Sequence, residues 1–341
     1  MKKVLDIKNL SVNFNTYAGT IKAVRDISFD VREGETLAIV GESGCGKTVT
    51  AKSILRLLQE PLATITKESQ ILYNGTDVTK QDKKWLRTYR GSDVSMIFQD
   101  PMTSLNPTTK IGKQIEEAIL YHKKISKSEA KKKAIEKLKL VNIPNPEKRY
   151  ESYPHQLSGG MRQRVVIAIA LACNPNVLIA DEPTTALDVT IQAQIMELLK
   201  EIKTKLNTAI ILVTHDLGVV ANFADRVLVM YAGEIVERGT TREIFHNPQH
   251  PYTRALLNSV PKITVESKSE LYSLKGTPPD LILDLRCCPF FNRCEYCMGI
   301  CKETKPQDTE LSETHQLRCW LQHPQAPDVG FNQSGRGKNH E

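Results

Sequence analysis

Gly41-Glu42-Ser43-Gly44-Cys45-Gly46-Lys47-Thr48 is the stretch of this 341-residue chain that decides the fold, because it has the complete G-x-x-x-x-G-K-S/T spacing of a phosphate-binding loop. The apolar run before it, 37–40, predicts a buried parallel strand, and residues 49–58 have the apolar spacing of a helix. Glycines let successive backbone N–H groups turn toward phosphate oxygens, and the N-terminus of the following helix adds a positive partial charge. The loop therefore predicts a nucleoside triphosphate, with magnesium, as the ligand.

The residues of this loop have distinct expected roles. Lys47 should reach the β- and γ-phosphates, while the Thr48 hydroxyl should ligate Mg²⁺. The side chain of Cys45 is expected to be a small packing group. The positions expected to contact the nucleotide through the loop backbone are Gly41, Ser43, Gly44, Cys45, Gly46 and Val49.

Length and composition bound the rest of the chain. A length of 341 residues favours two domains, and 40% hydrophobic with 25% charged residues is typical of a globular protein with a sizeable core. The longest apolar run, Val165–Cys173, is far shorter than the ~18 to 20 residues of a membrane span, and the N-terminus has no apolar signal segment. We therefore expect a cytoplasmic location.

The net charge of +7 is modest and spread along the chain, apart from a lysine-rich stretch at 123–139. No aromatic residues are interleaved with those lysines, so the stretch is interpreted as a solvated helix face. We expect no nucleic-acid partner.

Strand-like and helix-like patterns alternate, which indicates an α/β fold, and several strands are continuously apolar, as in a parallel sheet covered on both faces. The expected strands are Val4–Leu10, Ile27–Val31, Thr36–Val40, Val94–Phe98, Val177–Ala180 and Ile210–Thr214. Residues 99–157 are mostly helical, including Ile111–Tyr121 and Ser128–Val141. Val227–Met230 and Glu234–Glu237 should form a hairpin around Ala232-Gly233.

A second informative run, Leu157-Ser158-Gly159-Gly160-Met161-Arg162-Gln163-Arg164, precedes an apolar strand that ends in Asp181-Glu182. Ser158 can cap the helix that follows it, and the two glycines permit close backbone approach to an anion. Asp181 can hold Mg²⁺, and Glu182 would orient or deprotonate the attacking water. Together with the phosphate loop, these runs resemble the ATP-binding cassette (ABC) family of P-loop NTPases.

The resemblance implies a domain organisation and a shared site. It implies an ABC nucleotide-binding domain over residues 1–260 with a helical subdomain at about 100–165, a small C-terminal cysteine-rich domain at 261–323 and a flexible tail at 324–341. Ser158, Gly159 and Gly160 would contact the γ-phosphate of ATP held by a partner subunit. ATP would then join two subunits, and its hydrolysis would release them.

Three further motifs follow in the order that the family predicts. Gln99 matches the Q-loop glutamine that senses Mg²⁺ and nucleotide, Asp188 of Ala186-Leu187-Asp188 matches the D-loop, and His215 matches the switch histidine. Tyr17, or else Phe14, is the candidate for stacking on adenine. The resemblance thus implies that Gln99, Glu182 and His215 are catalytic and that Thr48, Gln99 and Asp181 hold Mg²⁺.

Residues outside those motifs indicate the branch of the family. The segment 98–107, the run after Gly160 and His250-Pro251-Tyr252-Thr253 resemble the peptide and nickel importer ATPases, and among them the D-type ATP-binding subunit of an oligopeptide or dipeptide permease. This implies a peripheral protein on the cytoplasmic face of the membrane, which pairs with a related second ATPase beneath two transmembrane permease subunits, and indirectly with an extracellular solute-binding protein. A nickel importer ATPase and a soluble ABC ATPase stay open as alternatives.

Six of the eight cysteines lie between Cys287 and Cys319, and thiolates clustered in a reducing cytoplasm usually bind metal. The set Cys288, Cys294, Cys301 and Cys319 has a spacing similar to that of peptide importer ATPases, which implies a four-iron four-sulfur cluster. A competing set suits tetrahedral zinc and consists of Cys294, Cys297, His315 and Cys319. Only one set can form completely, because both use Cys294 and Cys319, and thiols without a metal are the third alternative.

Overall fold

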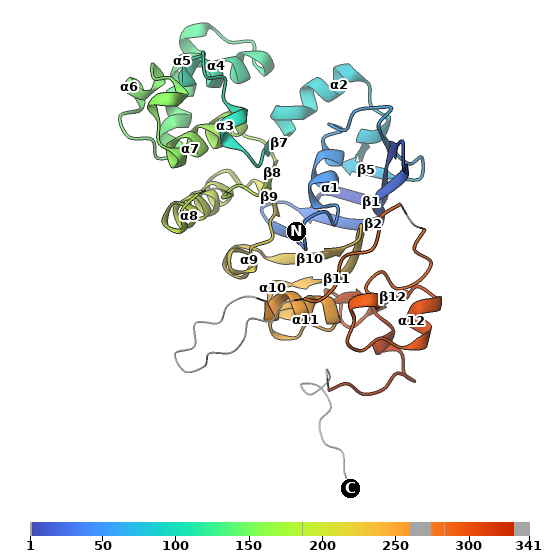
Figure 1. Cartoon of the computed structure of the whole chain (residues 1–341). Helices are drawn as coiled ribbons and strands as arrows, with labels where there is room; N and C mark the ends of the chain where they lie inside the picture. Colours follow the sequence, from blue (N-terminus) through green and yellow to red (C-terminus); the bar gives the residue numbers. More distant parts are fainter. Residues whose placement is uncertain (1, 186, 260–273, 283, 331–341) are drawn as a thin grey trace, which may run out of the picture.

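The structure is a computed structural model that describes residues 2–185, 187–259, 274–282 and 284–330. Among these residues the strands form an eight-stranded sheet and a five-stranded sheet (Figure 1). The order of the larger sheet is β12-β13-β11-β10-β3-β9-β8-β7, and that of the smaller is β2-β1-β5-β6, with β4 paired to β1. The α/β class expected from the sequence is therefore confirmed.

The bounds of the strands follow. The larger sheet contains β3 (Thr36–Val40), β7 (Val94–Ile97), β8 (Val177–Asp181), β9 (Ala209–Val213), β10 (Arg226–Tyr231), β11 (Glu234–Thr240), β12 (Asp308–Glu310) and β13 (Gln316–Arg318). The smaller, antiparallel sheet contains β1 (Lys3–Thr16), β2 (Gly19–Arg32), β4 (Ala63–Ile65), β5 (Gln70–Tyr73) and β6 (Thr76–Asp77).

The α-helices are α1 (Lys47–Ile54), α2 (Lys83–Thr88), α3 (Pro101–Ser104), α4 (Ile111–His122), α5 (Lys127–Leu140), α6 (Pro146–Tyr150), α7 (Gly159–Ala170), α8 (Val189–Leu206), α9 (Leu217–Phe223), α10 (Thr241–His246), α11 (Pro251–Asn258) and α12 (Gly299–Glu303). Short 3₁₀ turns are η1 (Val78–Lys80), η3 (Pro154–Gln156), η4 (Phe291–Arg293) and η5 (Trp320–Gln322), and η2 (Tyr89–Asp93) is a π-type turn. Figure 1 shows α4 to α7 gathered in one lobe, away from the smaller sheet. None of the described helices combines the length and apolar character that crossing a membrane requires.

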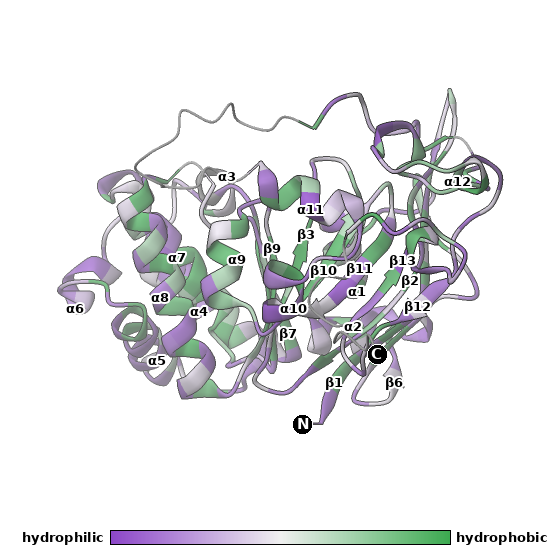
Figure 2. Ribbon diagram, turned by 90° about the horizontal axis from the view of Figure 1, so that it is seen from below, coloured by the Kyte–Doolittle hydropathy of each residue, from purple (hydrophilic) through white to green (hydrophobic). Residues whose placement is uncertain are grey.

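Hydrophobic cores cover both faces of the larger sheet, because successive side chains of a strand point to opposite faces. In β3, Ala38 and Val40 belong to one core, whereas Leu37 and Ile39 belong to the other. The helices α4, α5, α7 and α8 pack in the first core, and β1, β2 and α1 pack in the second. Figure 2 shows hydrophobic residues concentrated in the strands and alternating with hydrophilic residues around the helices.

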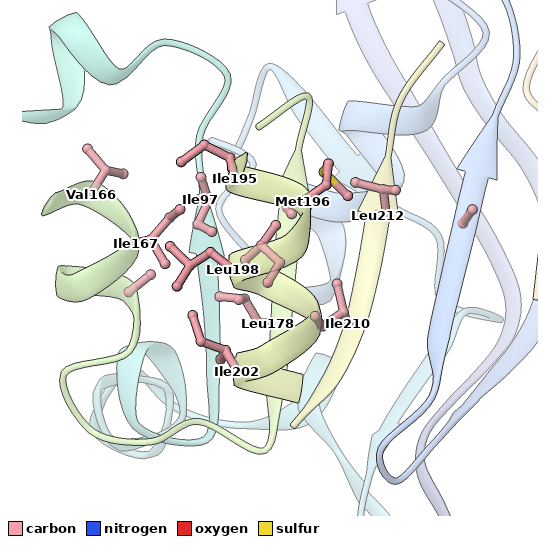
Figure 3. Close-up of a cluster of buried hydrophobic side chains, with 14 of the residues drawn as sticks. Ile97, Val166, Ile167, Leu178, Ile195, Met196, Leu198, Ile202, Ile210 and Leu212 are labelled. Carbon is pink, nitrogen blue, oxygen red and sulfur yellow. The ribbon is translucent and has the colours of Figure 1, made fainter. Parts of the chain in front are cut away.

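The long helix α8 shows how a helix covers this sheet. Its buried residues recur every three or four positions, at Ile195, Leu198 and Ile202, which places them on one face. Figure 3 shows these side chains against the strand residues Leu178 and Ile210. Helix α8 thus packs across both β8 and β9. The candidate site residues Glu182 and His215 follow these two strands in the chain.

Four neighbouring strands of the larger sheet, β3, β9, β8 and β7, run parallel. Their carboxyl ends therefore meet at one edge of the sheet, where ligands bind in open α/β folds. The phosphate loop follows β3, Gln99 follows β7, and Glu182 and His215 follow β8 and β9. The order of the strands thus brings together motifs that are up to about 170 residues apart in the chain.

The expected elements are present, with shifts at their ends. The hairpin of β10 and β11 turns at Ala232 and Gly233, whose φ angles of 48° and 85° suit a two-residue hairpin turn. The helix after the phosphate loop is shorter than the sequence pattern indicates. It ends at Ile54, two residues before Arg56, whose left-handed φ of 48° is incompatible with a continuing helix.

The cysteine-rich segment is not confirmed as a separate small domain. Its strand β13 pairs with β11, which makes it part of the larger sheet, and β12 pairs with β13. Cys288, Phe290 and Cys301 belong to the same buried cluster as the helices and strands of the nucleotide-binding part. The expected boundary at 260–261, and the tail beyond residue 330, lie outside the described residues.

Candidate functional site

The phosphate loop between β3 and α1 depends on glycine at two positions of close backbone contact. A Cβ on Gly41 would lie 2.2 Å from the carbonyl oxygen of Met230, and one on Gly46 would lie 2.5 Å from that of Ala23. Both glycines also have positive φ angles, 149° and 104°, that side chains disfavour. The loop therefore packs closely against the backbone of β10 and β2, and this packing restricts its shape.

Contacts within the loop and burial fix Lys47 and Cys45. Lys47 Nζ donates to the carbonyl oxygens of Gly41 and Glu42, at 2.7 and 2.9 Å. Ser43 and Gly44 are exposed, while the Cys45 side chain is 5% exposed, and burial raises the pKa of its thiol. Cys45 is thus a packing residue whose thiol stays protonated at neutral pH.

Thr48, the last residue of the phosphate-loop motif, contacts Asp181. The Thr48 hydroxyl donates to Asp181 Oδ1 at 3.0 Å, although the residues lie on α1 and β8. Asp181 is 2% exposed, and burial, with the nearby charge of Glu182, raises its pKa despite the hydrogen bond from Thr48. A buried carboxylate beside a hydroxyl is a set of oxygen donors that suits Mg²⁺.

Glu182 is at the centre of a second bonded group. Its Oε2 accepts from Gln99 Nε2 at 2.9 Å and from the Thr185 hydroxyl at 3.0 Å, and its Oε1 lies 3.0 Å from His215 Nδ1. The residue has a left-handed φ of 46°, which a non-glycine residue rarely adopts. Its backbone N–H donates to Val213 of β9 at 2.8 Å, so the neighbouring strand holds this strained turn.

The charge of Glu182 is stabilised by its partners. Burial alone would raise its pKa, but the hydrogen bonds from His215 and Thr185, with the charges of His215 and Lys47, bring the pKa below the ordinary glutamate value. Asp181 and Glu182 are adjacent in sequence, yet their pKa values shift in opposite directions. Two neighbouring acids with pKa values pushed apart are suited to different tasks.

The remaining predicted residues lie outside these two bonded groups. Ser158 and Gly159 are exposed at the start of α7, and Ser158 caps that helix by accepting from the Met161 N–H at 3.4 Å. Asp188 caps α8 by accepting from the Ile191 N–H at 2.9 Å, while its neighbour Ala186 is outside the described residues. In this chain alone, the signature residues and Asp188 thus have structural roles at helix N-termini.

The two candidates for stacking on adenine differ sharply. Tyr17 is fully exposed at the turn between β1 and β2. Phe14 packs against the core between the two sheets, which leaves its ring less free to receive a base. Val49 also packs against this core, on the first turn of α1.

Comparison with protein families agrees with this geometry. The ABC transporter profile matches residues 24–185, and the profile of the oligopeptide/dipeptide transporter C-terminal region matches residues 236–301. A dipeptide transport ATP-binding protein, DppD of Bacillus subtilis, is 55% identical over 96% of this chain and 97% of its own length. This chain belongs to the ABC transporter family.

Other ABC relatives give the same result. The oligopeptide transport ATP-binding protein OppD of Bacillus subtilis is 54% identical over 96% of this chain and 91% of its own length. OppD of Salmonella typhimurium is 49% identical over 89% of each chain.

Solved ABC structures support the cassette fold. The dimeric ATP-binding cassette MJ0796, in a post-hydrolysis state bound to ADP and Pi, matches with a TM-score of 0.62 and 29% identity, over 70% of this chain and 99% of that one. CbiO1 of Clostridium perfringens, part of an ABC transporter complex, matches with a TM-score of 0.62 and 30% identity, over 72% and 91%. The fold is therefore that of an ABC ATPase.

Several contacts in this ABC cassette were not predicted from the sequence. Gln163 of α7 is buried and donates to the carbonyl oxygen of Pro183 at 2.6 Å, which joins the signature helix to the turn after Glu182. Gln163 belongs to the signature run, so its position could have been noticed. Arg293 contacts Glu42 of the phosphate loop, and no sequence signal indicates this contact because 250 residues separate the partners.

The iron-sulfur and zinc sites expected in the cysteine-rich segment are not confirmed. Within the described ranges, no group of three or more His, Cys, Asp or Glu side chains is arranged to hold a metal ion. Of the zinc set, His315 is buried and bonded through Nε2 to Glu237 Oε1 at 2.8 Å, so one ring nitrogen is already used. Cys288 is nevertheless close enough to Cys294, Cys301 and Cys319 for their charges to help burial raise the pKa of its thiol.

Proposed function

We propose that this ABC ATPase energises the uptake of oligopeptides or dipeptides through a membrane permease. The observation that carries the proposal is the 55% identity to a dipeptide transport ATP-binding protein along 96% of the chain. The match to the oligopeptide/dipeptide transporter C-terminal region supports the same substrate class. Oligopeptide and dipeptide relatives match almost equally well, so the length of the peptide stays open.

In this proposal, Lys47 and Glu182 act on ATP, and His215, as the switch histidine, would contact the γ-phosphate. Lys47 would bind the β- and γ-phosphates from the loop on which its ammonium already lies. Glu182, with its lowered pKa, is ionised at neutral pH and accepts a hydrogen bond from the attacking water. As the water oxygen bonds to the γ-phosphorus, the bond to the β–γ bridging oxygen breaks and ADP leaves with that electron pair. The proton lost by the water passes to an oxygen of the transferred phosphate. A low pKa favours orienting the water over strong basicity.

The residues that would hold Mg²⁺ are Thr48, Asp181 and Gln99. Thr48 and Asp181 are already bonded to each other, and Gln99 reaches Glu182 from the end of β7. Mg²⁺ supplies charge neutralisation for the triphosphate. A cation beside Asp181 would also offset the burial that raises its pKa.

Ser158, Gly159 and Gly160 would act on the ATP of a partner subunit. Ser158 and Gly159 are exposed and contact neither the Thr48–Asp181 pair nor the group around Glu182. This is the arrangement expected of residues that contact the ATP of another subunit. The related cassette MJ0796 is dimeric with ADP and Pi, which supports a two-subunit arrangement. Asp188 and Tyr17 complete the proposed nucleotide contacts.

The proposed assembly is a membrane transporter. The chain would pair with a related second ATPase, lie on the cytoplasmic face of the membrane beneath two permease subunits, and receive solute indirectly from an extracellular binding protein. The names of the relatives, which are peptide transport ATP-binding proteins, support such partners.

The cysteine segment is proposed to hold a four-iron four-sulfur cluster on Cys288, Cys294, Cys301 and Cys319. Cys288 and Cys301 belong to one buried cluster, and Cys294 packs against it. Burial and the neighbouring thiols raise the pKa of Cys319 to about 12 and that of Cys294 to about 11. The test is iron, sulfide and zinc analysis of protein purified without oxygen. Iron with equimolar sulfide supports the cluster, zinc selects the second set, and neither metal overturns both.

The transport proposal is tested with the chain, its partner ATPase, the permease and the binding protein reconstituted in vesicles. We expect labelled peptide to accumulate only with ATP, and not with the Glu182→Gln variant. Nickel uptake in place of peptide uptake would select the nickel importer alternative. ATP hydrolysis that is insensitive to the permease would select the soluble ATPase and overturn the proposal.

A further inference from the structure

Among the described residues, the C-terminal segment reaches the phosphate loop through a partly buried ion pair. Arg293 Nη1 donates to Glu42 Oε2 at 2.6 Å, and Nη2 donates to Glu42 Oε1 at 2.9 Å. The Arg293 side chain is 3% exposed, so the pair is shielded from solvent on that side. The two parallel hydrogen bonds fix both the position and the plane of the Glu42 carboxylate.

A second contact holds the backbone of the same loop residue. The Glu42 N–H donates to the Tyr252 hydroxyl at 2.8 Å. Tyr252 packs against Tyr231 and Phe290, with ring centroids 4.6 and 5.4 Å away, and Arg293 also donates to the Tyr231 hydroxyl at 3.3 Å. We call Tyr231, Tyr252, Phe290 and Arg293 the loop bracket. It joins β10, α11 and the cysteine segment around Glu42.

Fixing Glu42 also fixes the lysine expected to bind phosphate. Lys47 Nζ donates to the carbonyl oxygen of Glu42 at 2.9 Å and to that of Gly41 at 2.7 Å. The bracket holds Glu42 by its side chain and by its N–H. That N–H shares a planar peptide group with the Gly41 carbonyl, so the Tyr252 hydroxyl limits rotation of one of the two carbonyls that orient Lys47. Arg293 of the C-terminal segment and Tyr252 of α11 thereby constrain the shape of the loop at Glu42.

The chemistry of the pair favours a positioning role over a stabilising one. A buried ion pair is weak evidence for stability, because desolvation of two charges offsets their attraction. What it supplies is a fixed geometry, and arginine supplies this better than lysine because its planar fork binds both carboxylate oxygens. Arg293 Nε also donates to the carbonyl oxygen of Lys275 at 3.0 Å, so the same side chain ties two parts of the C-terminal segment to the loop.

We propose that Arg293 is a positioning residue for ATP binding, which acts through Glu42 on the phosphate loop. The inference rests on the proposed ATPase function. It also links the cysteine-rich segment to the ATP site, because Arg293 directly precedes Cys294 and follows Cys288 by five residues. The backbone bond from Cys288 N–H to the Cys301 carbonyl, at 3.0 Å, holds this segment in shape.

The test is equilibrium binding of ATP with Mg²⁺ to the full chain, together with KM and kcat of the assembled ATPase. Arg293→Met is expected to raise Kd and KM about tenfold, within the ~100-fold that a misplacement of about 1 Å can cost, while kcat changes little. Arg293→Lys should recover part of the affinity. In the double variant Arg293→Met/Glu42→Gln, the rise in Kd should be no larger than in the worse single variant, because both changes break the same pair.

Arg226→Met is the matched control. It removes another arginine that pairs with two carboxylates, the buried Glu35 and the partly buried Asp30, at the opposite end of β3 from the loop. A lower unfolding midpoint with unchanged Kd is expected for this control. Equal Kd for Arg293→Met and wild type, or an equal rise for Arg226→Met, overturns the inference. If Arg293→Met does not fold, Arg293→Lys and Glu42→Gln decide by the same comparison of Kd. Failure of the wild type to bind ATP would instead contradict the proposed function.

Discussion

At the scale of single residues, Glu182 is the most constrained group of the candidate site. It combines a left-handed backbone with hydrogen bonds from Gln99 and Thr185 and a contact with His215. These three partners lie on three segments of the chain, which follow the neighbouring parallel strands β7, β8 and β9. The carboxylate is therefore aimed by its surroundings, and changes to it should affect chemistry more than binding.

Glu182→Gln is expected to lower kcat by about 100-fold or more, the contribution of a positioned acid–base group. Affinity for ATP should survive, because Lys47 and Thr48 are unchanged. ATP hydrolysis and nucleotide binding are measured on the same preparation. Glu197→Gln, on the exposed part of α8, is the control. Normal hydrolysis by Glu182→Gln would remove the role assigned to this carboxylate.

Thr185→Val is expected to move the acidic limb of the kcat–pH profile to higher pH. The hydroxyl of Thr185 is one of the groups that lower the pKa of Glu182, so its loss raises that pKa. A base with a raised pKa becomes protonated, and inactive, at a higher pH as the solution is acidified. Thr185→Ser keeps the donor and should leave the limb in place. A limb that is identical in all three proteins would contradict this account.

At the scale of elements, the start of the signature helix α7 packs tightly against α8. A Cβ on Gly160 would lie 2.8 Å from Ile191 Cγ2, whereas one on Gly159 would be 3.9 Å from its nearest neighbour, Leu187 Cδ2. The two glycines are adjacent in sequence, but only the second is required by this packing.

Gly160→Ala is therefore expected to destabilise the fold by about 1 to 3 kcal/mol, as overpacking does. Gly159→Ala, the matched control, should be neutral or slightly stabilising because alanine favours a helix. In the double variant Gly160→Ala/Ile191→Ala, the loss should be smaller than the sum of the single losses. Denaturant unfolding measures each free energy. Equal effects at 159 and 160 would show that the α7–α8 contact does not set the requirement.

At the scale of the whole molecule, the residues of the candidate site lie in two separate places. Lys47, Asp181 and Glu182 lie around one edge of the larger sheet, while Ser158 is exposed at the start of α7 and bonded only within its own helix among the described contacts. Such a division is understandable if a second subunit supplies the missing side of each site.

Ser158→Arg should therefore abolish ATP-driven association with the partner ATPase while the isolated chain still binds ATP. The larger, charged side chain would occupy the interface proposed between the two ATPases without touching the phosphate loop of its own chain. Association is measured by sedimentation of the two ATPases with and without ATP. Ser128→Arg, at an exposed position of α5, should associate normally. Unchanged association of Ser158→Arg would contradict a shared site.

The sequence by itself predicted the local motifs. The phosphate loop and the acids at the end of β8 were indicated by their spacing next to apolar strands, and Gln99 and His215 by resemblance to the ABC family. It also determined the α/β class, since periodicity reports which residues are buried. Only the tertiary structure decided which motifs meet, that the cysteine segment joins the larger sheet through β13, and that Arg293 holds Glu42. The physical reason is that contacts between residues far apart in the chain depend on strand order and packing, and these leave no periodic mark in the sequence.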